Sequence, residues 1–162
     1  MIRKIISGIL AVMVILSPML VCTSCAKKIP AMSYGKTEIT ANMYKYFACS
    51  YKSVFASTYS DFSDTPAFWQ SVADGDMTAE EYLTETVLKN VKMTLVCAEK
   101  YDTFGGRLSS SVTKRIDDTI SSYRNEYANG SSKVFNSVLA EYGVNERILR
   151  EIYVLESKAD AL

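Results

Sequence analysis

The placement of glycine and proline constrains this chain more than any other feature. After residue 31 the glycines fall at positions 35, 75, 105, 106, 130 and 143, and Pro66 is the only proline. None interrupts a segment in which apolar residues recur every three or four positions, the spacing of one helix face. Helical domains are divided in this way, by glycine at helix ends and polar caps at helix starts. The body of the chain is therefore predicted to be all-α.

The segments between these breaks predict about five helices in a single bundle. The clearest helix start is at Thr78, because Thr78 and Glu81 have the spacing of a capping box. The expected helices cover about residues 41–59, 79–103, 109–128, 132–142 and 145–162, opening at Thr40, Thr78, Ser109, Ser132 and Asn145. The third helix is expected to turn Tyr123 and Tyr127 inward with its apolar residues.

Two segments outside these helices carry further expectations. Residues 31–39 are predicted to form a short extended segment that turns at Gly35. The connection over residues 60–76 contains the apolar pair Phe68 and Trp69, which is expected to dip into the core.

The first 25 residues have the organisation of an export signal. Arg3 and Lys4 precede an apolar run of about a dozen residues, which is short for a membrane-spanning helix. The small residues Thr23 and Ser24 then precede Cys25, an arrangement that resembles the lipobox of bacterial lipoproteins. We expect Cys25 to be lipidated and residues 26–32 to form a tether, which places the protein extracytoplasmically on a bacterial cell membrane. Secretion after ordinary cleavage and retention by an uncleaved signal are the alternatives.

Composition removes several classes of function. The chain has no histidine, which excludes Ser-His and Cys-His nucleophile pairs and His-ligated zinc. Its 18 basic residues balance 18 acidic ones without a basic stripe, so no nucleic-acid partner is expected. No catalytic residue, cofactor or metal site is predicted. Cys49 and Cys97, the two cysteines of the body, are interpreted as partly buried thiols, with a disulfide as the alternative.

The order of these pieces carries a resemblance. An extended lead is followed by Glu38-Ile39-Thr40 and a helix with spaced aromatic residues; a long capped helix ends at Gly105-Gly106, and the turn Tyr142-Gly143-Val144-Asn145-Glu146 opens the last helix. Residues 33–162 thus resemble the N-terminal helical domain of SurA/PrsA-type extracytoplasmic foldases, which is related in fold to the peptide-binding part of trigger factor.

The resemblance implies a function as well as a fold. In that family the helical domain binds unfolded or newly exported polypeptides, and a parvulin domain with prolyl isomerase activity usually follows. The chain reaches Leu162 about where such a domain would begin, so the resemblance implies chaperone-like binding without isomerase activity. The alternatives are an accessory lipoprotein that docks one specific partner and a truncated prolyl isomerase relative that lacks its catalytic domain.

Tyrosines off the expected inner stripes are the candidate peptide contacts. Four tyrosines fit this description: Tyr44, Tyr46, Tyr59 and Tyr153. Tyrosine joins a large apolar ring to a polar hydroxyl, which suits contact with polypeptides of varied sequence. The competing interpretation is that they are ordinary core and rim tyrosines of a small bundle.

Overall fold

The computed structural model describes residues 30–162, which form six helices and two small two-stranded sheets. The helices are α2 (Ala41–Thr58), α3 (Pro66–Trp69), α4 (Ala79–Thr103), α5 (Ser110–Ala128), α6 (Ser132–Glu141) and α7 (Glu146–Asp160). The strands are β1 (Pro30–Tyr34), β2 (Thr37–Thr40), β3 (Val72–Asp74) and β4 (Met77–Thr78). Helices hold 68% of these residues, so the prediction of a mainly helical domain is confirmed. The expected all-α bundle of about five helices is corrected by α3 and the β3–β4 hairpin, whereas the β1–β2 hairpin lies where an extended segment was expected.

The long helices begin where their capping residues predict. Thr78 forms a complete capping box: its hydroxyl accepts from the Glu81 amide at 3.2 Å, and the Glu81 carboxylate accepts from the Thr78 amide at 2.9 Å. Thr40, Ser109 and Asn145 cap α2, α5 and α7 through the same side-chain contact with an early amide. The cap of α6 is Ser131, one residue before the expected start.

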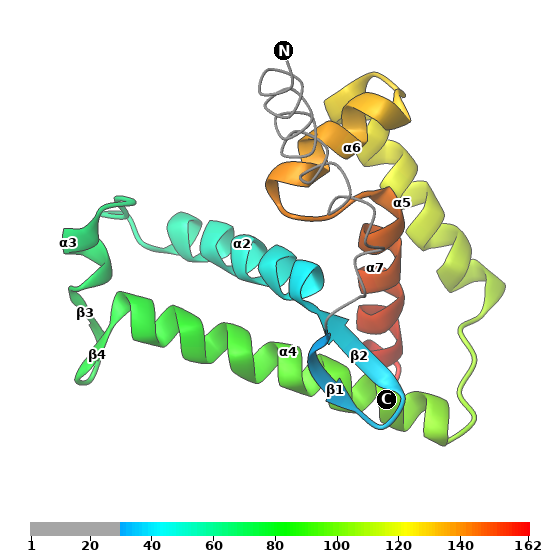
Figure 1. The fold of residues 1–162 in the computed structure, drawn as a ribbon, viewed down its shortest axis with the longest axis horizontal. Coiled ribbons are helices and arrows are strands. Elements are labelled where there is room, and N and C mark those ends of the chain that lie inside the picture. Colours follow the sequence, from blue (N-terminus) through cyan, green and yellow to red (C-terminus); the bar gives the residue numbers. More distant parts are fainter. Residues whose placement is uncertain (1–29) are drawn as a thin grey trace, which may run out of the picture.

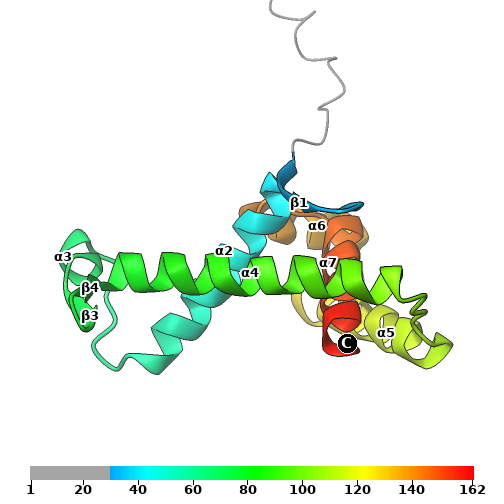
Figure 2. The same ribbon diagram turned by 90° about the horizontal axis from the view of Figure 1, so that it is seen from below.

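The elements form a compact end and a projecting arm (Figure 1). The arm consists of α2 and α4, which pack together and extend to α3 and the β3–β4 hairpin at its tip. At the other end α5 and α6 complete the domain, and α7 contacts α2, α4, α5 and α6. Figure 2 shows α7 crossing the long α4 close to the C-terminal end of α4. The position of α7 therefore depends on four helices that together extend from residue 41 to residue 141.

The main core lies where α7 meets these helices. Its completely buried side chains include Ile39, Val91 and Ile152, from β2, α4 and α7. Leu149 and Ile152 lie three residues apart on α7, so both belong to the apolar stripe that faces the core. Burying an aliphatic side chain of this size contributes about 1.5–3 kcal/mol.

A second, aromatic cluster lies at the tip of the arm. Phe55 is buried there and stacks on Tyr59 and Trp69, with ring centroids 4.2 Å and 5.7 Å apart, while Phe68 meets Phe55 edge-to-face. The expectation that Phe68 and Trp69 dip into the main core is therefore wrong. They pack on the far end of α2, because Pro66 opens the short helix α3 that presents both rings to Phe55.

The β1–β2 hairpin confirms the turn predicted at Gly35. Tyr34 pairs with Thr37, which leaves Gly35 and Lys36 as a two-residue loop, and Gly35 has a φ of +60°. The Glu99 carboxylate of α4 accepts hydrogen bonds from the Lys36 amide at 3.1 Å and the Thr37 hydroxyl at 2.7 Å. A Cβ atom on residue 35 would lie 2.2 Å from the Glu99 Oε1 atom, so only glycine allows this contact. The hairpin includes residues 30–32, the end of the expected tether.

Candidate functional site

A groove between α2, α5, α6 and α7 at the compact end is lined mainly by aromatic and apolar residues. It has a volume of about 470 Å³, and we call it the tyrosine groove. Its lining residues are Tyr46, Ser50, Ser53, Tyr123, Tyr127, Phe135, Val138, Leu139, Tyr142, Leu149 and Tyr153. Phe135, Leu139 and Leu149 are buried core residues, so they form an apolar floor beneath the tyrosines. An apolar floor with a few polar groups above it is typical of a binding pocket.

The tyrosines occupy two levels of this groove. Tyr46 and Tyr153 are half-buried, whereas Tyr123, Tyr127 and Tyr142 remain 37%, 58% and 40% exposed. Tyr123 and Tyr127 are four residues apart on α5, which places them one above the other with ring centroids 6.1 Å apart. The groove thus offers aromatic rings at its rim as well as in its interior.

Burial keeps the inner tyrosines in their neutral, hydrogen-bonding form. Burial raises the pKa of Tyr46, and hydrogen bonding with Tyr153 and Ser50 opposes that effect. Burial is also the largest cause of the raised pKa of Tyr153, to which the charge and hydrogen bond of Tyr46 add. Both phenols therefore remain protonated at neutral pH.

Glu156 lies on the face of α7 that carries Leu149 and Tyr153. Its position, three residues after Tyr153 and seven after Leu149, is one turn beyond the groove on that face. Burial, and then the nearby charge of Asp160, raise the pKa of Glu156 to about 7. The Glu156 charge in turn contributes to the raised pKa values of Tyr46 and Tyr51.

The structure separates the four tyrosines selected from sequence. Tyr46 and Tyr153 line the groove together. Tyr44 packs against the main core, and Tyr59 stacks on Phe55 in the aromatic cluster of the arm. These last two side chains do not share a surface with the groove.

Sequence reasoning missed three groove tyrosines. Tyr123 and Tyr127 were expected to point inward, but the core-facing positions of α5 are taken by Ile116 and Ile120, and both tyrosine rings are exposed. Tyr142 follows the end of α6 and was not selected. Their i,i+4 spacing on a mostly polar helix was an available signal for Tyr123 and Tyr127. Tyr142 continues the apolar stripe of Phe135, Val138 and Leu139, which also line the groove, so this spacing was an available signal too.

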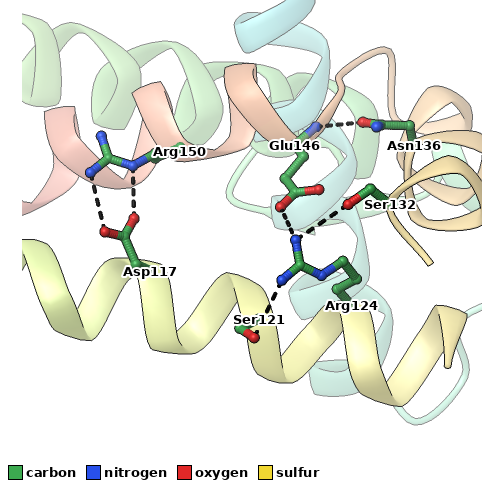
Figure 3. Close-up of polar contacts among 7 residues, drawn as sticks. All are labelled: Asp117, Ser121, Arg124, Ser132, Asn136, Glu146 and Arg150. Atoms are coloured by element: carbon green, nitrogen blue, oxygen red, sulfur yellow. Dashed lines mark hydrogen bonds and ion pairs between the residues drawn. The ribbon is translucent and has the colours of Figure 1, made fainter. Parts of the chain in front are cut away.

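A second groove, of about 820 Å³, lies between α5, α6 and α7, and apart from Ile120 its lining residues are polar or charged; we call it the polar groove. The Arg150 guanidinium donates to both carboxylate oxygens of Asp117, at 2.8 Å and 3.4 Å (Figure 3). This hydrogen bonding, together with the Arg150 charge, lowers the pKa of Asp117. The Arg124 guanidinium pairs with Glu146 at 2.6 Å. It also donates hydrogen bonds to the hydroxyls of Ser121 and Ser132 (Figure 3).

These polar contacts fix the helices that shape the tyrosine groove. Asn136 of α6 accepts from the Glu146 amide at 2.8 Å, which joins α6 to the start of α7. The third arginine of the polar groove, Arg147, pairs with Glu151. Each of the three arginines that line this groove therefore has a carboxylate partner. We therefore interpret the polar groove as structural: ion pairs hold α5 against α7, and the Asn136 hydrogen bond holds α6 against α7.

Two cysteines lie within residues 30–162. Cys49 on α2 and Cys97 on α4 are half-buried free thiols. This part of the chain contains no group of three or more acidic, cysteine or histidine side chains placed to hold a metal ion. None of its helices has the length and apolar character needed to cross a membrane. The predicted lipidation site Cys25 and the signal segment lie outside the described residues.

Comparison of the chain with protein-family models, curated proteins and solved structures finds no match. The interpretation of the tyrosine groove therefore depends on its own geometry and chemistry.

Proposed function

We propose that this protein is a chaperone-like binding module for unfolded or newly exported polypeptides, and that the tyrosine groove is its binding site. The supporting observation is the combination of an apolar floor with five tyrosines in one groove. Tyrosine supplies large contact area at a low conformational cost, and its hydroxyl bonds to any peptide backbone. Such a surface favours binding to many extended segments without strict sequence selection.

A lipid on Cys25 is proposed to hold this module on the outer face of a bacterial membrane. The supporting pattern is the apolar run followed by Thr23-Ser24-Cys25. A diacylated cysteine gives stable anchoring, whereas a single chain is marginal. Labelled fatty acid should enter the wild-type protein and should not enter Cys25→Ala. Equal labelling of the two proteins would contradict the proposed anchor.

The groove is tested by filling it. Ser53 lines the groove from α2 and is exposed at its edge, so Ser53→Trp adds a large ring to the binding volume. Ser122→Trp is the matched control, because Ser122 is exposed on α5 and does not line the groove. Light scattering of a denatured client follows its aggregation with each full-length variant present. We expect wild type and Ser122→Trp to suppress aggregation, and Ser53→Trp to lose most of this effect.

The outcomes distinguish the proposal from its alternatives. Full suppression by Ser53→Trp, with an unchanged urea midpoint, would place client binding elsewhere. No suppression by wild type at a several-fold molar excess would favour an accessory lipoprotein with one specific partner. A proline-switch peptide assay on the same samples should show no turnover, since the groove offers only tyrosine and serine hydroxyls as polar side-chain groups. Measurable turnover would contradict the proposal that this chain binds polypeptides without isomerase activity.

A further inference from the structure

The tyrosine groove is lined without any positively charged side chain. Its eleven lining residues are five tyrosines, two serines and four apolar residues, and they include neither lysine nor arginine. This contrasts with the polar groove, which is lined by three arginines. The two grooves share α5, α6 and α7, so the difference comes from which face of each helix they use.

Carboxylates lie beside the tyrosines at two places. At the rim, the Glu126 carboxylate raises the pKa of Tyr127 through a hydrogen bond and through its charge. Deeper in the domain, Glu156 follows Tyr153 by one turn on the same face of α7. Neither carboxylate has a lysine or arginine partner among the ion pairs of the described residues.

Lys45, which precedes Tyr46 on α2, does not bring positive charge into the groove to balance these carboxylates. Lys45 lies at the turn that follows Tyr142, where a Cβ atom on residue 143 would come 2.8 Å from the Lys45 Cδ atom. The Lys45 side chain thus covers Gly143, and Lys45 is absent from the groove lining.

We infer that the tyrosine groove selects a basic side chain, arginine above all, of the polypeptide that occupies it. This inference rests on the proposed function, because it names the residue class of the bound segment. The exposed rings of Tyr123, Tyr127 and Tyr142 are the primary contacts. The Glu126 carboxylate beside Tyr127 supplies complementary negative charge, and Glu156 adds to it in its ionised form.

The physical basis is the charge distribution of aromatic rings. The face of a tyrosine ring carries partial negative charge and attracts a cation within about 6 Å of its centre. Guanidinium suits this groove better than ammonium, because it is planar, stacks on rings and is less strongly hydrated. Its five N–H groups also match the hydroxyl acceptors of Ser50, Ser53 and the tyrosines. The apolar floor accommodates the methylene stem of the same side chain.

The test uses three labelled peptides that differ at one central position. One carries arginine, the second carries neutral citrulline of nearly the same shape, and the third carries leucine. Fluorescence anisotropy with the full-length protein measures the three dissociation constants. We expect the arginine peptide to bind roughly tenfold more tightly than the citrulline peptide, as two or three cation–ring contacts predict.

Groove variants show whether the rings cause the preference. Tyr127→Phe keeps the ring and should retain the preference for arginine. The double variant Tyr123→Leu, Tyr127→Leu should lower it to about twofold or less, since leucine preserves apolar area without a ring face. Tyr34→Leu is the matched control, because Tyr34 is 42% exposed on β1 and does not line the groove.

Each result separates this inference from the proposed function. Equal binding of the three peptides, or tighter binding of the leucine peptide, would overturn the basic-residue preference and leave the polypeptide-binding proposal in place. Retention of the full arginine preference by the double leucine variant would also overturn the inference. Failure of all three peptides to bind, together with no suppression of client aggregation, would overturn both.

Discussion

Replacement of Glu156 by glutamine should change how the stability of this protein depends on pH. The Glu156 carboxyl is half-buried on α7, and burial together with Asp160 raises its pKa to about 7, from an ordinary value of 4.5. A raised carboxyl pKa means that the folded state holds the proton more tightly than the unfolded state. The Glu156 contribution to stability is therefore complete below about pH 4.5 and is lost as the pH rises through about 7.

The size of this effect follows from the difference between the two pKa values. At 1.36 kcal/mol for each unit of pKa, a change from 4.5 to about 7 corresponds to about 3 kcal/mol. The Glu156 side chain is only half-buried, so solvent screening lowers this figure to about 1–2 kcal/mol. Glutamine resembles the protonated carboxyl in shape and carries no charge at any pH. Glu156→Gln should therefore match wild type near pH 4.5 and be about 1–2 kcal/mol more stable near pH 8.5.

Urea unfolding of the full-length proteins at several pH values between 4.5 and 8.5 measures this difference. The matched control is Glu141→Gln, at an exposed carboxyl at the end of α6, which should follow the wild-type pH profile. Parallel profiles for wild type and Glu156→Gln over the whole range would refute the reasoning. So would a lower stability of Glu156→Gln at pH 8.5, because it would mean that the charged carboxylate is stabilising.

Three further predictions test local features, each by the urea midpoint of the full-length protein. Thr78→Ala should lower stability by about 1 kcal/mol, because it leaves early amides of α4 without their capping partner; an unchanged midpoint would contradict this. Gly35→Ala should cost at least about 1 kcal/mol, through its positive φ and its clash with Glu99, whereas tolerance of alanine would mean that the hairpin moves off α4. Arg124→Ala should cost about 1–2 kcal/mol, since it leaves the half-buried Glu146 unpaired, and should exceed the cost of Asp117→Ala in the exposed pair with Arg150; equal costs would contradict the role of burial.

The tyrosine groove could not be predicted from any one segment, because its lining comes from four helices that meet only in the folded protein. The orientation of α5 illustrates this, because Tyr123 and Tyr127 satisfy an inward-facing spacing as well as Ile116 and Ile120 do. Packing of α5 against α7 selects the isoleucines for the core and turns the tyrosines toward α2 and α6. The polar groove has the same origin, since Arg150 and Asp117 are 33 residues apart and Arg124 and Glu146 are 22 apart.

The sequence by itself determined where the long helices begin and end and that the chain turns at Gly35. These features are local: a cap bonds an amide two or three residues away, and apolar spacing within one helix marks its buried stripe. Only the tertiary structure decided that Tyr46 and Tyr153 share a groove, while Tyr44 faces the core and Tyr59 belongs to the aromatic tip of the arm. A helix can rotate about its axis without changing its own hydrogen bonds, so the face that each tyrosine meets is set by the packing of distant segments.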